Sequence, residues 1–411
     1  MTGILSLTPQ GQPTVLAPQP PGGEDLVRYR AHGGYAPAPA PDQLLDRIAI
    51  AQLRGRGGAG FPAAVKLRTL RDAPGDTVVV ANGEEGEPGS VKDRWLLRHR
   101  PHLVLDGLRL AAAVTGAGRG YVYLADPAAE AAVRRALTER PPGIPVEVVV
   151  TEHTYVAGEE SAVVRRIDGG PALPTAKPPR PFERGVGGAP TLVANVETLA
   201  RVALLTSHPD AAAAVATTHL VTIAGPGSEP VLVEAPAGTH LKTLADLCGH
   251  GRAPAVLLGG LFGGVHGTGW TDLRLDHDEL AAAGGALGCG ALHFLAPGDC
   301  PVGAAADAAG YLAAQSARQC GVCVSGTRAF AGTLAAVARG ESGEEDTEKL
   351  RRWSTQLPGR GACGLLDAAA RIAATLLGHF PDRVEDHRHT PCPGCSAAPP
   401  RDGDRLVVAV P

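Results

Sequence analysis

The segment that decides the fold of the first half of the chain reads Arg54-Gly-Arg-Gly-Gly-Ala-Gly-Phe-Pro62. Its four glycines in six residues let the backbone approach a ligand closely, and Pro62 favours the first turn of a helix. Free N–H groups at the start of that helix attract an anion. The segment predicts a phosphate-bearing cofactor, with a plain glycine-rich connector as the alternative. Lys66, one turn into the helix, adds a cation and favours the cofactor.

Strands and helices alternate around this segment. Asp42 is the predicted N-cap of a helix over residues 43–53. Short, β-branched runs predict buried strands at Thr77 to Ala81, Tyr121 to Ala125 and Val146 to Val150. Helical patterns lie between them, at Ser90 to His99, His102 to Thr115 and Pro127 to Glu139. This alternation predicts a parallel-sheet α/β domain over residues 42–208.

The rest of the chain divides into four further regions. Residues 1–41 are rich in Pro, Gly and Ala and predict a flexible extension. Residues 216–272 contain strand-like runs at 220–224, 231–235 and 255–258 and a helix near 241–247, a pattern similar to a β-grasp module. Residues 275–386 are Ala- and Leu-rich and predict a small helical domain. Residues 387–411 read as a separate tail with a Cys-Pro-Gly-Cys sequence and a strand-like run at Leu406 to Val410.

The composition of the chain disfavours several classes of function. The 411 residues carry 38 basic and 42 acidic side chains, a net charge of −4, which disfavours nucleic acid as a partner. The longest uncharged stretch, residues 280–298, is too rich in glycine for a membrane span, and the N-terminus lacks the features of a secretory signal. We therefore expect a cytoplasmic protein without membrane insertion, in which the eight cysteines are thiols or metal ligands.

Three more polar segments follow strands or begin helices. Asn82-Gly-Glu-Glu-Gly-Glu-Pro-Gly89 follows the first predicted strand, where open α/β sheets bind ligands. Tyr155-Val-Ala-Gly-Glu-Glu-Ser161 places two acids at a helix start, and Lys177-Pro-Pro precedes Pro190-Thr-Leu-Val-Ala-Asn-Val-Glu-Thr198. Each segment alone is typical of a solvated turn or a helix cap. Together, and in this order along the chain, the segments are a far more specific indication of one protein family.

This ordered set resembles the flavin-bearing, NADH-oxidising F-type subunit of respiratory complex I and related subunits of soluble NAD-dependent hydrogenases and formate dehydrogenases. The resemblance runs from about residue 33 to 387. It implies a Rossmann-like FMN domain, a β-grasp-like (SLBB-type) module and a helical domain carrying one [4Fe-4S] cluster.

Site residues follow from the resemblance, motif by motif. The cofactor-binding set that it implies is Gly55, Gly57, Gly58, Gly60, Phe61, Lys66, Asn82, Glu84, Tyr155, Gly158, Glu159, Asn195 and Thr198. Glu85, Glu87, Glu160 and Lys177 would lie nearer the nicotinamide nucleotide, and Glu85 and Glu160 are the predicted catalytic residues.

The chain departs from the family at two places in the nucleotide site. The family stacks the nucleotide rings on aromatic side chains; Phe61 is retained, but Thr69 and Arg180 stand at two other aromatic positions. Loss of two aromatic platforms would weaken NADH binding about tenfold to a hundredfold. Arg180 would alternatively contact a phosphate and favour NADPH or a different donor.

A larger departure concerns the cluster. The family pattern is Cys-x2-Cys-x2-Cys with a fourth cysteine about forty residues on, and a [4Fe-4S] cluster is ordinarily held by four thiolates. Here Cys320, Cys323 and Cys363 remain, and glycine stands at position 326. Candidates for the missing ligand are Cys392, Cys395, Ser325, Cys289 and Cys300. Two alternatives stay open: no cluster forms, or Cys392 and Cys395, with His387 and His389 nearby, make a zinc site of their own.

The sequence thus predicts an FMN-dependent oxidoreductase subunit that takes a hydride from NADH, or NADPH, and passes single electrons through an iron–sulfur centre. The implied electron partner is a [2Fe-2S] subunit or a ferredoxin, with peripheral membrane association only through such a partner. The alternatives are a flavoprotein that exchanges electrons with a ferredoxin without NADH, and a non-catalytic assembly subunit that keeps the fold.

Overall fold

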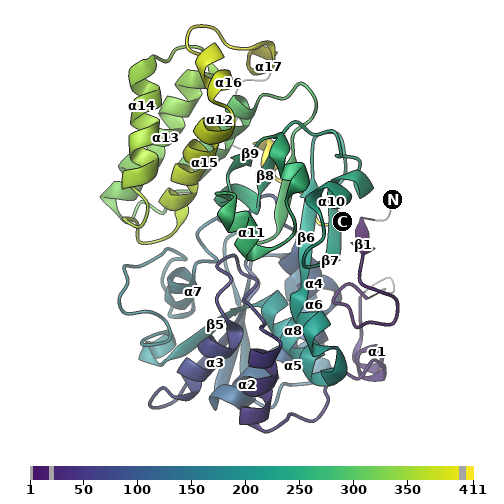
Figure 1. Ribbon diagram of the computed structural model, residues 1–411. Helices are drawn as coiled ribbons and strands as arrows, with labels where there is room; N and C mark the ends of the chain where they lie inside the picture. Colours follow the sequence, from purple (N-terminus) through teal and green to yellow (C-terminus); the bar gives the residue numbers. More distant parts are fainter. Residues whose placement is uncertain (1–2, 18–22, 398–403) are drawn as a thin grey trace.

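The computed structural model describes residues 3–17, 23–397 and 404–411 (Figure 1). Its first domain is built on a parallel sheet with the strand order β4-β3-β2-β5. The strands are β2 (Val78–Asn82), β3 (Arg119–Leu124), β4 (Val146–Val150) and β5 (Thr191–Asn195). Val79, Val80 and Ala81 of the inner strand β2 are completely buried, which explains their continuous apolar run. The predicted α/β fold with a parallel sheet is confirmed.

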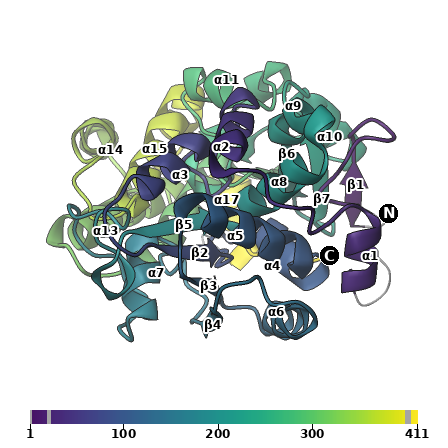
Figure 2. The same cartoon turned by 90° about the horizontal axis from the view of Figure 1, so that it is seen from below.

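Helices cover both faces of this sheet (Figure 2). They are α2 (Pro41–Ile50), α3 (Ala63–Arg71), α4 (Lys92–His99), α5 (Pro101–Thr115), α6 (Pro127–Glu139), α7 (Glu160–Ile167), α8 (Val196–Ser207) and α9 (Ala212–Thr217). The α2 helix starts earlier than predicted, so that Ala40 is its N-cap and Asp42 lies in its first turn. Gly107 lets α5 approach α8 closely, because a Cβ atom there would lie 2.0 Å from the Leu199 carbonyl oxygen.

The strand order creates a switch point between β2 and β5. The chain runs from β2 outward through β3 to β4, then returns to the other side of β2 as β5. Asn82 and Asn195 end these two strands and are register partners. Ligands of open α/β sheets bind beyond the carboxyl ends of strands at such a point. The two asparagines therefore mark where a ligand is expected.

A second, mixed sheet has the order β1-β7-β6-β10-β8-β9. Its strands are β1 (Ile4–Ser6), β6 (Thr218–Ala224), β7 (Val231–Pro236), β8 (Val256–Leu258), β9 (Val265–His266) and β10 (Ala291–Phe294), accompanied by α10 (Leu241–Leu247) and α11 (His277–Ala282). The strand-like runs predicted within 216–272 are all present. The sheet extends further, however, because β10 inserts between β6 and β8 from a stretch predicted to belong to the helical domain.

The N-terminal region differs from the flexible extension predicted for residues 1–41. Strand β1 pairs with β7, with Leu5 opposite Val233, and α1 (Leu26–Ala31) follows. Val15 is completely buried, and the hydroxyl of buried Tyr29 donates to Asp106 over 2.8 Å. These apolar residues have no local periodicity, so their burial depends on partners that are distant in sequence. Residues 1–2 and 18–22 of this prediction lie outside the described residues.

The helical domain contains α12 (Pro301–Ala314), α13 (Gly321–Ala338), α14 (Glu344–Gln356), α15 (Leu365–His379) and α16 (Pro381–Asp386), and α17 (Pro393–Ala397) follows it (Figure 1). By length and composition alone, α13 is apolar enough to cross a membrane. It packs against α12 and α15, and its Phe330 and Leu334 are completely buried, as in the core helix of a bundle.

The C-terminal tail is not a separate unit in its described parts. The strand predicted for residues 406–410 is absent there; instead the Val408 N–H donates to the Pro88 carbonyl over 3.0 Å, and Leu406 is buried. Arg405 forms an ion pair with Asp307 of α12. The tail therefore packs back onto both the first domain and the helical domain.

Candidate flavin and nucleotide site

The glycine-rich segment forms a closed loop next to the switch point. The Gly55 N–H donates to the Phe61 carbonyl over 2.8 Å, and Arg54 and Pro62 form a bridge below it. Gly58 and Gly60 adopt φ angles of +111° and +62°, which strongly favour glycine. The N–H groups of residues 57–61 donate no hydrogen bond to any part of the chain that the structure describes. Such a row of free donors fits a phosphate group.

Arg56 anchors this loop from below. Its backbone N–H donates to Thr198 Oγ1 over 2.8 Å, and its guanidinium contacts His219 and the Ala216 carbonyl. The side chain is buried, and this burial lowers the pKa of Arg56 to about 9. Arg56 therefore supports the loop instead of facing a ligand, and Thr198 serves the loop through its hydroxyl.

A cavity of about 400 Å³ opens on one side of the loop. Gly58 and Gly60 line it together with the charged side chains of Arg54, Arg371 and Asp278. Asp278 pairs with Arg54 over 3.3 Å. Two arginines against one aspartate give the surroundings of the loop a net positive charge, which favours an anionic ligand.

The two asparagines at the switch point hold neighbouring loops. Asn82 donates from Nδ2 to the Gly158 carbonyl over 2.8 Å and accepts from the Glu84 N–H over 3.2 Å. Asn195 is the N-cap of α8 and donates to Asp93 over 2.7 Å. Four segments predicted to bind the cofactor therefore meet here: the glycine loop, the end of β2, the Gly158 loop and the start of α8.

Beneath them lies a buried cluster of charges that the sequence analysis missed. Lys92, whose side chain is only 1% exposed, pairs with Asp93 over 2.7 Å and with Glu197 over 3.3 Å. Arg201 pairs with Glu197 over 2.8 Å. Burial lowers the pKa of Lys92, but Asp93 and Glu197 outweigh it and hold this pKa above its ordinary value. Because such charges are stable only when paired, the cluster fixes Asn195 and the start of α4 in place.

The three acids after β2 have different surroundings. Glu84 accepts from His153 over 3.0 Å, and burial raises the pKa of its carboxyl group. Glu85 accepts from Ser90 Oγ over 2.5 Å and from the first N–H groups of α4 over 3.1 Å. Both Glu85 oxygens are thus engaged within the protein, and its catalytic role stays a prediction.

Glu87 lies between the first domain and the mixed sheet. It accepts from the Leu261 N–H over 3.2 Å, and a Cβ atom on Gly260 would lie 2.3 Å from its carboxyl carbon. Burial raises the pKa of Glu87 to about 7.

A row of alternating charges leads from the glycine loop towards α7. Lys66 donates to the carbonyl of Val193 in the middle of β5 over 2.6 Å and lies 3.7 Å from Glu160. Lys177 contacts Glu159 and lies 3.8 Å from Glu160. Glu159 is also the N-cap of α7 and accepts from the Ser161 N–H over 3.0 Å. The structure thus brings these four predicted residues together.

The three positions at which the family carries aromatic residues hold, in this chain, one aromatic ring and two side chains without a ring. Phe61 is 52% exposed and free to stack on a planar ring. Thr69 is exposed and turns its hydroxyl back to the Val65 carbonyl, and Arg180 is an exposed residue in the loop after Lys177. Of the three positions, only Phe61 offers a ring.

The loop that carries Tyr155 joins this site to the helical domain. The Tyr155 N–H donates to Gln315 over 3.0 Å, and its ring meets that of Tyr311 edge-on at 6.1 Å. Arg165 of α7 contacts Gln319, directly before Cys320. The flavin site and the first cysteine of the cluster region are thus connected through one short segment.

The cluster region itself retains three cysteines. Cys320 is the N-cap of α13, Cys323 is buried one turn later, and its thiol donates to Cys363, which lowers the pKa of Cys363 to about 7. At position 326 a Cβ atom would lie 2.8 Å from Leu366 Cδ1. The chain thus keeps cysteines at three of the four family positions, and the third position of the pattern faces a leucine.

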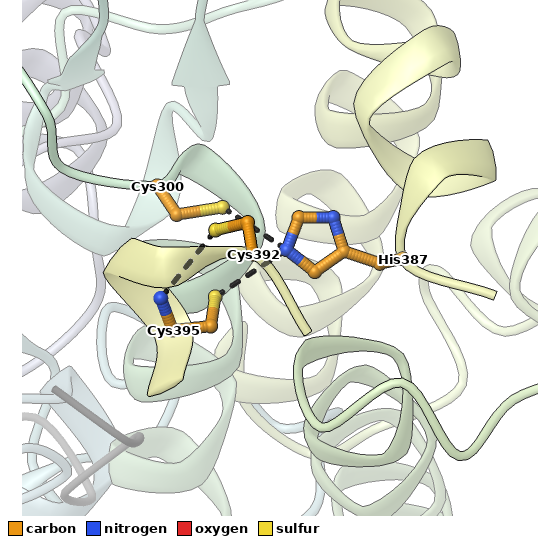
Figure 3. A group of neighbouring side chains, drawn as sticks. All are labelled: Cys300, His387, Cys392 and Cys395. Carbon is orange, nitrogen blue, oxygen red and sulfur yellow. Dashed lines mark hydrogen bonds between the residues drawn. The ribbon is translucent and has the colours of Figure 1, made fainter. Parts of the chain in front are cut away.

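The tail cysteines form a group of their own. Cys392 and Cys395 group with Cys300 and His387, with all four ligand atoms within 4.8 Å of one another (Figure 3). This grouping at the start of α12 favours a separate metal site over a fourth ligand for Cys320, Cys323 and Cys363, and the identity of that ligand stays a prediction. His389 is not a member of this tail group, and Ser325 is exposed on α13.

Comparisons with known proteins agree with this arrangement. Residues 48–204 match the Nuo51 FMN-binding domain, and residues 303–387 match the NADH-ubiquinone oxidoreductase-F iron–sulfur binding region. The second of the NADH-quinone oxidoreductase F subunits of Rhizobium meliloti is 31% identical over 88% of this chain and 93% of its own length. The NADH-quinone oxidoreductase F subunit of Aquifex aeolicus is 29% identical over 88% of this chain and 91% of its own length.

Two further relatives come from hydrogenases. The NADP-reducing hydrogenase subunit HndC of Solidesulfovibrio fructosivorans is 28% identical over 89% of this chain and 80% of its own length. A crystal structure of an NAD+-reducing [NiFe]-hydrogenase in the air-oxidized state contains a chain with a TM-score of 0.74 and 28% identity, covering 90% of this chain and 67% of that one.

Proposed function

The chain belongs to the family of NADH-oxidising, FMN-bearing F subunits of NADH-quinone oxidoreductase, and on that premise we propose which of its residues carry the activity. The observation that supports the proposal most is the convergence at the switch point. Asn82, Asn195 and the free N–H groups of residues 57–61 meet there with Lys66. When bound, FMN accepts two electrons as a hydride and releases them singly, and a [4Fe-4S] cluster carries single electrons onward.

The glycine loop and Lys66 are the proposed phosphate and ribityl contacts. The free N–H groups of residues 57–61 bind the phosphate, and Gly55 to Gly60 leave the space for it. Lys66 adds a positive charge beside β5, and Asn82 holds the Gly158 loop next to the end of β2. Glu84 and Tyr155 complete the set from the loops beside β2.

Phe61, Glu160 and Lys177 are the proposed nucleotide contacts. Phe61 stacks on a ring of the dinucleotide, and the carboxylate of Glu160, held between Lys66 and Lys177, accepts from sugar hydroxyls. Arg180 lies in the same loop and favours NADPH if its guanidinium meets a 2′-phosphate. These residues orient the nucleotide, and no covalent nucleophile is required.

The electron acceptor is the remaining part of the proposal. The Tyr155 segment leads from the flavin site to Cys320, so electrons leave through the helical domain. We propose that a cytoplasmic partner, a [2Fe-2S] subunit or a ferredoxin, accepts them. The hydrogenase and quinone oxidoreductase relatives described above are by name subunits of larger enzymes, which supports a partner of this kind.

Flavin content and its reduction test the proposal. The purified chain should show flavin absorbance that bleaches on anaerobic addition of NADH or NADPH. Lys66→Gln should lower the flavin content, whereas Lys242→Gln, a matched change at an exposed lysine of α10, should not. Flavin that is bound but bleached by neither nucleotide would overturn the donor assignment, and a chain without flavin would favour an assembly subunit.

A further inference from the structure

Four potential metal ligands meet where the tail returns to the helical domain. Cys300 precedes α12, His387 follows α16, and Cys392 and Cys395 flank the start of α17 (Figure 3). His387 Nε2 lies 3.5 Å from the Cys300 sulfur and 3.5 Å from the Cys395 sulfur. A tetrahedral Zn²⁺ ion with bonds of about 2.3 Å to sulfur and about 2.0 Å to nitrogen separates its S and N ligands by about 3.5 Å. The distances from His387 Nε2 to the two sulfur atoms therefore match those between ligands of one shared ion.

The surrounding structure orients each ligand. His387 is completely buried, and its Nδ1 hydrogen-bonds to the Arg383 carbonyl over 2.6 Å. Since a carbonyl only accepts, Nδ1 carries the proton and Nε2 presents its lone pair to the three sulfurs, a common arrangement behind a metal-bound histidine. The Cys395 N–H points at the Cys392 sulfur over 3.4 Å, which favours a thiolate in this turn.

Two glycines make the close approach possible. At Gly303, in the first turn of α12, a Cβ atom would lie 3.2 Å from the Cys395 sulfur. At Gly394, inside the Cys-Pro-Gly-Cys turn, it would lie 2.9 Å from the Gly298 carbonyl oxygen. Any other residue at Gly394 would push the turn away from Cys300. The four ligands thus come together because the backbone on both sides permits it.

We propose that Cys300, His387, Cys392 and Cys395 form a structural zinc site. Three thiolates and one imidazole are a common structural zinc set, and a set of four protein ligands leaves no open position for a substrate. The ligand atoms all lie within 4.8 Å, which suits one ion and leaves too little room for a four-iron cubane. The site fastens the residues after α16 to the start of α12.

Metal analysis of the full chain tests the site. The untagged protein is purified anaerobically without chelators, and zinc and iron are measured by mass spectrometry. We expect about one zinc per chain. The variant Cys392→Ser/Cys395→Ser should lose zinc at least about tenfold. Cys248→Ser is the matched control, because Cys248 is a buried cysteine outside the group, and it should keep the zinc.

A second measurement separates metal loss from misfolding. Co²⁺ replacing zinc in the wild-type chain should show intense visible bands of tetrahedral geometry with thiolate-to-cobalt charge transfer. His387→Cys keeps four ligands and should keep the zinc, with stronger charge transfer in the Co²⁺ form. Iron in place of zinc, a disulfide among these cysteines, failure to take up Co²⁺, or zinc retained in the double serine variant would each overturn the proposal.

Discussion

Two cysteine groups lie in the C-terminal half of the chain, and they contrast in almost every respect. The α13 group consists of Cys320, Cys323 and Cys363, and the tail site consists of Cys300, His387, Cys392 and Cys395. The α13 group lies in the region that matches the family's iron–sulfur binding region, and its cysteine spacing follows the family pattern. It nevertheless has only three of the four cysteine ligands of that pattern. Three of the four residues of the tail site lie outside the matched family region, which ends at residue 387, yet the tail site has four ligands within reach of one ion.

The difference lies in what faces the ligand positions. In the α13 group the third position of the pattern is Gly326, and the side chain of Leu366 lies where a ligand would begin. In the tail site Gly303 and Gly394 remove the atoms that would keep the ligands apart. Whether a group of cysteines is complete thus depends on the opposing backbone, which a spacing pattern does not contain.

The largest effect is expected when zinc is removed. A chelator should lower the melting temperature of the chain and expose residues 387–397 to proteolysis, because the site ties these residues to the start of α12. Structural zinc binds peptides with about 10–16 kcal/mol, so a loss of several kcal/mol in the free energy of unfolding is expected. Calorimetry with and without chelator measures it. Unchanged melting would mean that packing alone holds the tail.

Only part of this contrast between the two cysteine groups could be predicted from the sequence. The positions of the glycine loop, Asn82, Lys66 and Glu160 at a strand end or in the first turns of a helix could be predicted because each lies in a short, ordered motif, whereas their roles follow from the family resemblance and stay predictions. Strand β1, the buried Val15 and the union of Cys300 with Cys395 were not, because they join segments far apart in sequence. The charge cluster around Lys92 was missed since its members look like ordinary surface charges until burial is known.

The next largest effect should separate the two groups. Cys363→Ala removes one of three thiolates from the α13 group, and iron should fall from about four atoms per chain to nearly none. Zinc and flavin should stay unchanged, because the tail site and the switch point share no residue with this group. Metal analysis measures the iron and zinc contents, and the low-temperature electron paramagnetic resonance signal measures the loss of the cluster. A parallel loss of zinc would show that the two groups are not independent.

A smaller effect is expected from changes at Gly326. Gly326→Ala places a methyl group against Leu366 and should cost about 1 kcal/mol of stability. Gly326→Cys meets the same crowding but offers a fourth thiolate, so its cluster should resist chelators several-fold longer than that of the wild type. The alanine variant is the control for crowding. Equal cluster lifetimes in all three proteins would mean that position 326 faces away from the cluster.

The smallest expected effect is a dependence of stability on pH at Glu87, opposite in sign to the pH dependence that the tail site gives. Falling pH protonates thiolates and releases zinc, which destabilises the chain. Glu87 acts the other way: burial raises its pKa from 4.5 to about 7, so its proton stabilises the folded chain at low pH, and this contribution is lost as the pH rises through about 7. Glu87→Gln cannot ionise, so the stability of this variant relative to the wild type should increase between pH 5.5 and 8. Melting curves at constant zinc measure this difference, and parallel curves for the two proteins would show that Glu87 ionises normally.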